Sequence, residues 1–142
     1  AINDGATARV HQAVSMAELM DIYHQSDVAL HAEAFDVTNR HAVRMSFSTK
    51  IVDCMDSGCA VMAICDKKQA GGSYLRRNGC AICIHELAQI KSVLCDIVTH
   101  PEQLIEMQHM AFEVGRKYHL QKNINQDLIN DFEGLCKNKK GK

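Results

Sequence analysis

Residues 27–35 read Asp27-Val28-Ala29-Leu30-His31-Ala32-Glu33-Ala34-Phe35, a run that is apolar on both of its alternating faces. Such a pattern is typical of a strand that is covered by helices on both sides of its sheet. The runs Ala60 to Cys65 and Cys80 to Ile84 have the same character, and stretches of helical periodicity separate the three. Strands that alternate with helices predict an α/β chain with a parallel sheet.

The N-terminal third of the chain predicts one more strand, a helix and a loop. Val10 to Val14 is a weak first strand. The Ser-x-x-Glu capping box of Ser15 and Glu18 then opens a helix. The stretch 36–48 is polar and has no sustained period, which predicts a loop.

Helical periodicity predicts five helices in the rest of the chain. Two short helices are expected, one from Ile51 to Ser57 and one from Gly71 to Asn78, each ended by a glycine. Longer helices are expected after the last strand, and a second capping box of Thr99 and Glu102 is predicted to open one of them. The longer helices cover 87–97, 102–118 and 124–135.

About four parallel strands and these helices predict a Rossmann-like, three-layer α/β/α domain. We expect this domain to cover residues 1–136, followed by a basic tail over residues 137–142. Doubly wound domains usually contain five or six strands. We therefore expect the N-terminal part of the domain to be missing from this chain.

Composition supports one globular domain. Of 142 residues, 46% are hydrophobic and 23% charged, which excludes the disordered, collagen-like and coiled-coil classes. The net charge is −1, so no global positive field attracts nucleic acid or anionic lipid. No apolar stretch reaches roughly 20 residues and no signal peptide is evident, which predicts a soluble, cytoplasmic protein and leaves membrane contact open. The seven cysteines are then expected to be reduced core thiols.

Ligand chemistry is expected where the carboxyl ends of the parallel strands meet. Three segments are expected there, namely 33–36, 46–50 and 66–73. Ser48, Thr49 and Lys50 add two hydroxyls and an ammonium to the free amides of a helix start, which suits a phosphate group. Spacing alone favours the alternative, in which Ser48 or Thr49 caps the helix and Lys50 is solvated.

Two carboxylates near these segments have two interpretations each. Asp53 lies one turn after Thr49, where its carboxylate can bind vicinal hydroxyls of a ligand or form a surface ion pair with Lys50. Glu33 either faces a ligand or simply ends its strand in water. The residues alone leave these alternatives open.

No metal or cofactor site is predicted. Cys80 and Cys83 have the spacing of a metal or redox pair, but they fall in a buried strand and no second Cys/His pair follows at zinc spacing. The eight histidines include no His-x-x-x-His pair. Gly71 and Gly72 lack the Gly-x-Gly-x-x-Gly pattern of dinucleotide-binding folds.

Three blocks of the sequence carry a family resemblance. They are Ser26-Asp27-Val28-Ala29-Leu30-His31-Ala32-Glu33-Ala34-Phe35-Asp36, the segment 46–63 with Ser48-Thr49-Lys50-Ile51 and Ser57-Gly58, and Tyr74-Leu75-Arg76-Arg77-Asn78-Gly79. The chain resembles the C-terminal, donor-binding domain of GT-B glycosyltransferases. The nearest type is the retaining family 4 (group 1), which builds bacterial polysaccharides. Its members show an S-D-V-x-h-x-E-x-F strand and an S-T-K-I helix start.

The resemblance implies a nucleotide-sugar site in a hexosyltransferase. In the family, the positions of Ser48, Thr49 and Lys50 lie against the donor diphosphate, and that of Asp53 takes the ribose hydroxyls. Glu33 matches the first acid of an E-x7-E motif near the transferred sugar. Here nineteen residues separate Glu33 from Asp53, and the second acid is one methylene shorter than Glu. The resemblance assigns no catalytic residue, and the family usually needs no metal.

The implied partners are a nucleotide sugar as donor and an N-terminal acceptor domain that is missing here. The isolated domain is therefore expected to bind the donor weakly and to transfer no sugar. Fold alone leaves two other functions open. One is a nucleotide- or phosphate-sensing Rossmann-like module, and the other is a protein-interaction domain without catalysis.

Overall fold

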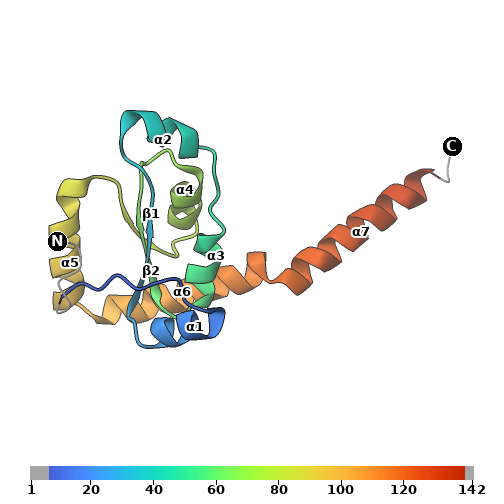
Figure 1. Ribbon diagram of the computed structural model, residues 1–142. Coiled ribbons are helices and arrows are strands. Elements are labelled where there is room, and N and C mark those ends of the chain that lie inside the picture. The colour runs from blue at the N-terminus through green and yellow to red at the C-terminus, as the bar shows by residue number, and fades with distance from the viewer. Residues whose placement is uncertain (1–6, 140–142) are drawn as a thin grey trace.

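A computed structural model describes residues 7–139 and confirms the α/β class (Figure 1). Three parallel strands form one open sheet in the order β1-β2-β3. The strands are β1 (Val28–Ala32), β2 (Ala60–Ile64) and β3 (Ile82–Ile84). Val28 pairs with Ala60, and Met62 pairs with Ile82, so β2 is the central strand.

The strand predicted at Val10 to Val14 is wrong. Residues 8–15 form no regular element, so the described part of the sheet has three strands rather than four. Val10 is 64% exposed and Val14 is 40% exposed. Because the segment buries little apolar surface, it does not offset the entropy cost of ordering a strand.

Helices lie on both faces of β2. The helices are α1 (Met16–His24), α2 (Val37–Val43), α3 (Lys50–Asp56), α4 (Ala70–Arg77), η1 (Leu87–Gln89), α5 (Ile90–Thr99), α6 (Glu102–His119) and α7 (Gln121–Lys139). Val61 on one face belongs to a core cluster with residues of α3, α4 and α6. Met62 on the other face packs with Ile84 of β3 and Ile97 of α5. Alternating side chains of one strand thus hold two helical layers.

The polar stretch 36–48 was predicted as a loop, and this is wrong because it contains α2. The Asp36 carboxylate accepts a hydrogen bond from the Asn39 amide at 2.9 Å and caps the helix. None of the residues of α2 is buried. A helix without a buried face has no apolar period, so periodicity could not reveal it.

One of the two predicted capping boxes is confirmed. The Ser15 amide donates to Glu18 Oε2 at 2.8 Å, and the Glu18 amide donates to Ser15 Oγ at 3.3 Å. The second box is wrong, since Thr99 Oγ1 donates to the Cys95 carbonyl at 2.8 Å. The Thr99 hydroxyl is therefore hydrogen-bonded within α5 and does not cap α6.

In the part of the chain that the structure describes, β1 is an edge strand that pairs with β2 alone. The Asp27 carbonyl accepts from the Ala60 amide and the Glu33 amide donates to the Ile64 carbonyl, both at 2.9 Å. The backbone N–H and C=O groups of the odd-numbered residues of β1 therefore point toward β2. Those of Leu30 and of its even-numbered neighbours point toward the open edge. This edge is also only partly covered by other side chains, because Leu30 is 58% exposed.

The C-terminal helix extends away from the body of the molecule (Figure 1). The amphipathic helix predicted over 124–135 is confirmed as part of α7, whose residues 121–137 are all exposed. The first residues of the predicted basic tail, 137–139, belong to α7, and residues 140–142 lie outside the described residues. Among residues 7–139, no helix is both long and apolar enough to cross a membrane.

The cysteine prediction holds for the core positions. Cys54, Cys59, Cys65 and Cys80 are buried free thiols. Burial raises the pKa of Cys65 and of Cys80 to about 11, so these thiols stay protonated and inert at neutral pH. Cys95 and Cys136 are exposed, so they are not core residues.

Candidate functional site

The carboxyl ends of the three strands meet at one edge of the sheet, beside α2 and α4 (Figure 1). Glu33 follows β1, Cys65 follows β2 and His85 follows β3. His85 Nδ1 lies 3.1 Å from the Cys65 carbonyl oxygen, which ties the last two strand ends together. The segments predicted to carry ligand chemistry therefore do gather at this edge.

His31 is the most unusual side chain of this edge. It lies on β1, is 4% exposed, and its Nε2 atom is 3.3 Å from Glu33 Oε1. The geometry of that contact gives no hydrogen bond, so Nε2 is a buried polar atom without a hydrogen-bond partner among residues 7–139. Such an atom costs about 1–3 kcal/mol of folding free energy.

Two charged groups from different elements act on the His31 ring. Burial lowers the pKa of His31, the Glu33 carboxylate opposes that shift, and the Lys50 ammonium adds to it. The imidazole is therefore neutral at pH 7. The charges of Glu33 and Lys50, which lie seventeen positions apart in the sequence, thus both affect the protonation of this ring.

The turn before α3 leaves three backbone amides without an internal partner. The Ile51 and Val52 amides donate to the carbonyls of Ser48 and Thr49 at 3.1 and 3.0 Å. Within the described chain, no hydrogen bond takes the amides of Ser48, Thr49 or Lys50. Thr49 makes no side-chain cap, so the capping alternative is wrong for that residue.

The electrostatic effect of this turn is small. α3 has seven residues, and its start carries one ammonium, that of Lys50. The backbone dipole of a helix start stabilises an anion by typically 0.3–1 kcal/mol. Lys50 is exposed and forms no ion pair with Asp53 among residues 7–137, so the ion-pair alternative is also wrong.

Asp53 lies away from Glu33. It lines a cavity of about 260 Å³ between α3 and α6, together with Asp56, Arg116 and His119. The pKa of Tyr23 on α1 is raised mainly by burial, then by Cys54, and after these by the charge of Asp53. The structure therefore places Glu33 beside His31, and it places Asp53 at a cavity that neither Glu33 nor Lys50 lines.

An aromatic cluster joins the turn to the Asp53 cavity. The Phe47 ring stacks on His119 with centroids 5.7 Å apart, and it meets Tyr74 edge-on at 5.2 Å. Tyr74 Oη lies 2.8 Å from His119 Nε2. Sequence reasoning missed this cluster because its three residues come from separate elements and show no common spacing.

The Gly71-Gly72 pair serves packing. A Cβ atom at Gly71 would overlap Ile51 Cδ1, and one at Gly72 would overlap Cys65 Sγ. Gln69 caps α4 by accepting from the Gly72 amide at 2.6 Å. The rejection of a dinucleotide fingerprint at this pair agrees with these contacts.

Basic side chains gather at the same edge, between α2 and the segment after β2. Arg40 Nη1 lies 3.5 Å from Asp66 Oδ2, and a cavity of about 240 Å³ opens beside the pair. Lys67 and Lys68 belong to the predicted ligand segment 66–73, but Arg40 of α2 and Arg44, which follows this helix, were missed with the helix itself.

The described residues hold no group of three His, Cys, Asp or Glu side chains that could bind a metal ion. Comparisons of the chain with protein-family models, with curated proteins and with solved structures return no match. The function is therefore inferred from the site alone.

Proposed function

We propose that the carboxyl edge of the sheet binds the donor of a glycosyltransferase, a nucleotide-diphosphate sugar. The diphosphate lies on the turn of Ser48, Thr49 and Lys50, and the sugar lies toward Glu33. The main support is the strand end at His31, where Glu33 Oε1 lies 3.3 Å from the buried ring nitrogen, and where the charge of Lys50, after burial, helps to lower the pKa of His31.

The turn supplies what a diphosphate needs. Its three unpartnered amides and the exposed Lys50 ammonium can donate charge-assisted hydrogen bonds to phosphate oxygens. One ammonium on a short helix gives modest stabilisation. Weak donor binding by this chain alone is therefore part of the proposal, as is the need for an acceptor domain before sugar is transferred.

Asp53 takes the ribose hydroxyls in this proposal. Its cavity begins beside the turn, because His119 lines that cavity and stacks on Phe47, the residue before Ser48. A nucleoside can then follow α3 from Lys50 to Asp53, with its diphosphate at one end and its ribose at the other. No catalytic residue is assigned.

A protein-interaction domain is the second candidate function. It is favoured by α7, where Leu128 is 53% exposed, Phe132 is 59% exposed and Leu135 is 64% exposed. Exposed apolar faces of this kind commonly mark contacts with other proteins.

Calorimetric titration with uridine and guanosine diphosphate sugars tests the proposal. We expect one of them to bind, and Lys50→Ala to weaken binding about tenfold, the loss expected for one charged hydrogen bond. Lys122→Ala on α7 is the matched control and should leave the affinity unchanged. No heat with either donor, or an equal loss in both variants, would contradict donor binding and favour the protein-interaction function.

A further inference from the structure

We infer that a second site on this edge, between α2 and the segment after β2, binds a phosphate or pyrophosphate group. The site is the cavity of about 240 Å³ described above, and we call it the basic cavity. Its lining residues are Arg40, His41, Arg44, Asp66, Lys67 and Lys68. Ser48, Thr49 and Lys50 do not line it, so the inference is independent of the proposed donor site.

The charge of the basic cavity differs sharply from that of the chain. The whole chain carries −1, whereas the cavity gathers four permanent cations around one carboxylate. That carboxylate, Asp66, pairs with Arg40 and also accepts the Lys68 amide at 2.9 Å. Within residues 7–137, the side chains of Arg44, Lys67 and Lys68 have no acidic partner. Three uncompensated cations at one cavity favour an anion.

Hydrogen bonds hold the two walls of the basic cavity in place. The Ala70 amide donates to the Arg44 carbonyl at 2.9 Å, and Gln69 Nε2 donates to the Ser46 carbonyl at 2.8 Å. Gln69 is 1% exposed, so this link is shielded from water. Ser73 Oγ fixes the other wall by donating to the Lys67 carbonyl at 3.1 Å. The backbone positions of the cations are therefore set before a ligand arrives, which lowers the entropy cost of binding.

The residue types and the volume indicate a small phosphate group. The planar fork of arginine matches two phosphate oxygens at once, and lysines add point charges. Cavities that enclose whole small molecules measure about 300–1,000 Å³, so this smaller one suits a single charged group. Its place at the carboxyl end of parallel strands is where phosphates bind in open α/β sheets. The group can be free or can belong to a phospholipid headgroup.

The test is a titration of the full chain at low ionic strength with two probes. One is inorganic pyrophosphate, and the other is phosphatidylcholine vesicles that contain phosphatidic acid. We expect at least one probe to bind, and Arg44→Ala and Lys68→Ala each to weaken it about tenfold. Asp66→Asn should strengthen binding severalfold, because it removes the only carboxylate of the cavity and frees Arg40. The probe that binds identifies the source of the phosphate.

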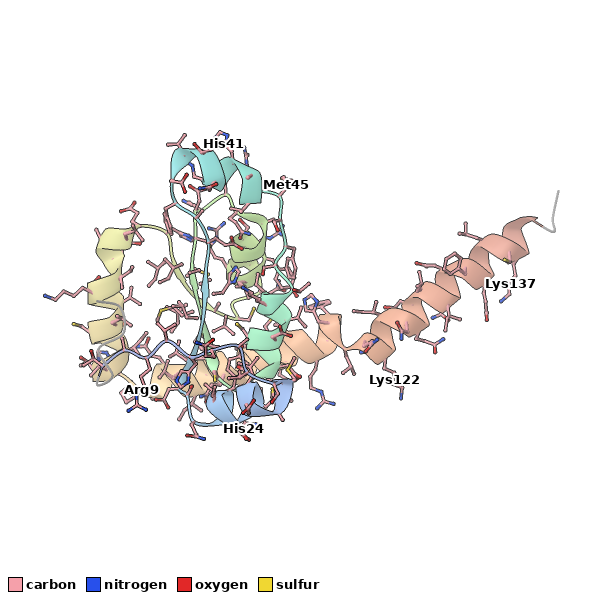
Figure 2. All side chains as sticks on the ribbon, viewed as in Figure 1. Arg9, His24, His41, Met45, Lys122 and Lys137 are labelled. Carbon is pink, nitrogen blue, oxygen red and sulfur yellow. The ribbon has the colours of Figure 1, made fainter. Side chains whose placement is uncertain are left out.

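Lys122→Ala is the control, since Lys122 lies on α7, far from His41 of the basic cavity (Figure 2). Equal affinity of the native chain, Arg44→Ala and Lys68→Ala would overturn the inference, as would weaker binding in Asp66→Asn. Loss of pyrophosphate binding in Lys50→Ala alone would also overturn it, because the anion would then lie on the donor turn. If donor-sugar binding survives Arg44→Ala, the donor site and the basic cavity are separate sites. The failure of one proposal is then distinguishable from the failure of the other.

Discussion

At the scale of single residues, His31 carries a cost to folding that no hydrogen bond among the described residues offsets. Its ring is buried on β1, and Nε2 has neither a protein hydrogen-bond partner nor access to solvent. The sequence placed His31 in a strand and Glu33 at its end, which the structure confirms for both. The sequence could not show that Lys50 acts on the same ring, since that contact depends on how α3 packs against β1.

Replacing the imidazole with an apolar side chain should stabilise the fold. We expect His31→Leu to raise the free energy of unfolding by about 1–2 kcal/mol, because it removes an unsatisfied buried polar atom. Urea unfolding at pH 7 measures the change. A fall in stability would instead show that the ring is needed for packing.

The lowered pKa of His31 predicts a pH dependence of stability. Burial keeps the folded state neutral, whereas the unfolded chain takes up a proton near the ordinary pKa of 6.5. The unfolded state then binds more protons, so stability falls as the pH drops below about 6.5 and stops falling at the folded pKa.

The measurement is the free energy of unfolding at pH 7.5 and pH 5.5. His31→Leu should lose less stability between these values than the native chain does. The pKa of His119 is also lowered by burial, so some dependence remains in the variant. A loss of equal size in both proteins would assign the whole effect to groups other than His31.

At the scale of elements, burial decides which segments the sequence reveals. β1, β2 and β3 were predictable because each of them lies within a run of apolar residues. α2 was missed because it buries no residue, and Val10 to Val14 was overpredicted because no helix or strand covers it. Local hydrogen bonds matter as well. The Thr99 hydroxyl donates to the Cys95 carbonyl of its own helix instead of capping the helix that follows.

The close contact of α4 with the sheet makes Gly72 sensitive to substitution. We expect Gly72→Ala to destabilise the fold by about 1–3 kcal/mol, because a Cβ atom would overlap Cys65 Sγ. Thermal or urea unfolding measures the loss. The second substitution Cys65→Ala should recover part of it by removing the sulfur atom.

Gly134→Ala is the matched control. Nothing lies within 4 Å of a Cβ atom at Gly134, which is in the exposed part of α7. Alanine should therefore leave stability unchanged or raise the helix content, since it is the better helix former by about 1 kcal/mol. Equal losses at both glycines would argue against the packing role of Gly72.

At the scale of the whole molecule, the body and α7 are structurally separate. The body holds both core clusters, and neither includes a residue of α7. The sequence predicted the helix from its apolar period, but period alone cannot tell whether a face is covered. That depends on the direction in which α6 ends, and α6 points α7 away from the sheet (Figure 1).

Removal of α7 should leave the body folded. We expect a chain that ends at Lys122 to have an unfolding free energy within about 0.5 kcal/mol of the full chain, since the removed residues up to 137 are exposed. Chemical unfolding followed by circular dichroism measures this. A loss of several kcal/mol would mean that the helix packs on the body in solution.

The described core contains no lysine, arginine, aspartate or glutamate. The charged side chains of the turn 48–50 and of the basic cavity lie outside this core. Mutations that reverse or delete those charges therefore leave the interior intact, and mutations in the interior need not disturb the charges. Substitutions of these surface charges can therefore accumulate one at a time, each in a chain that still folds.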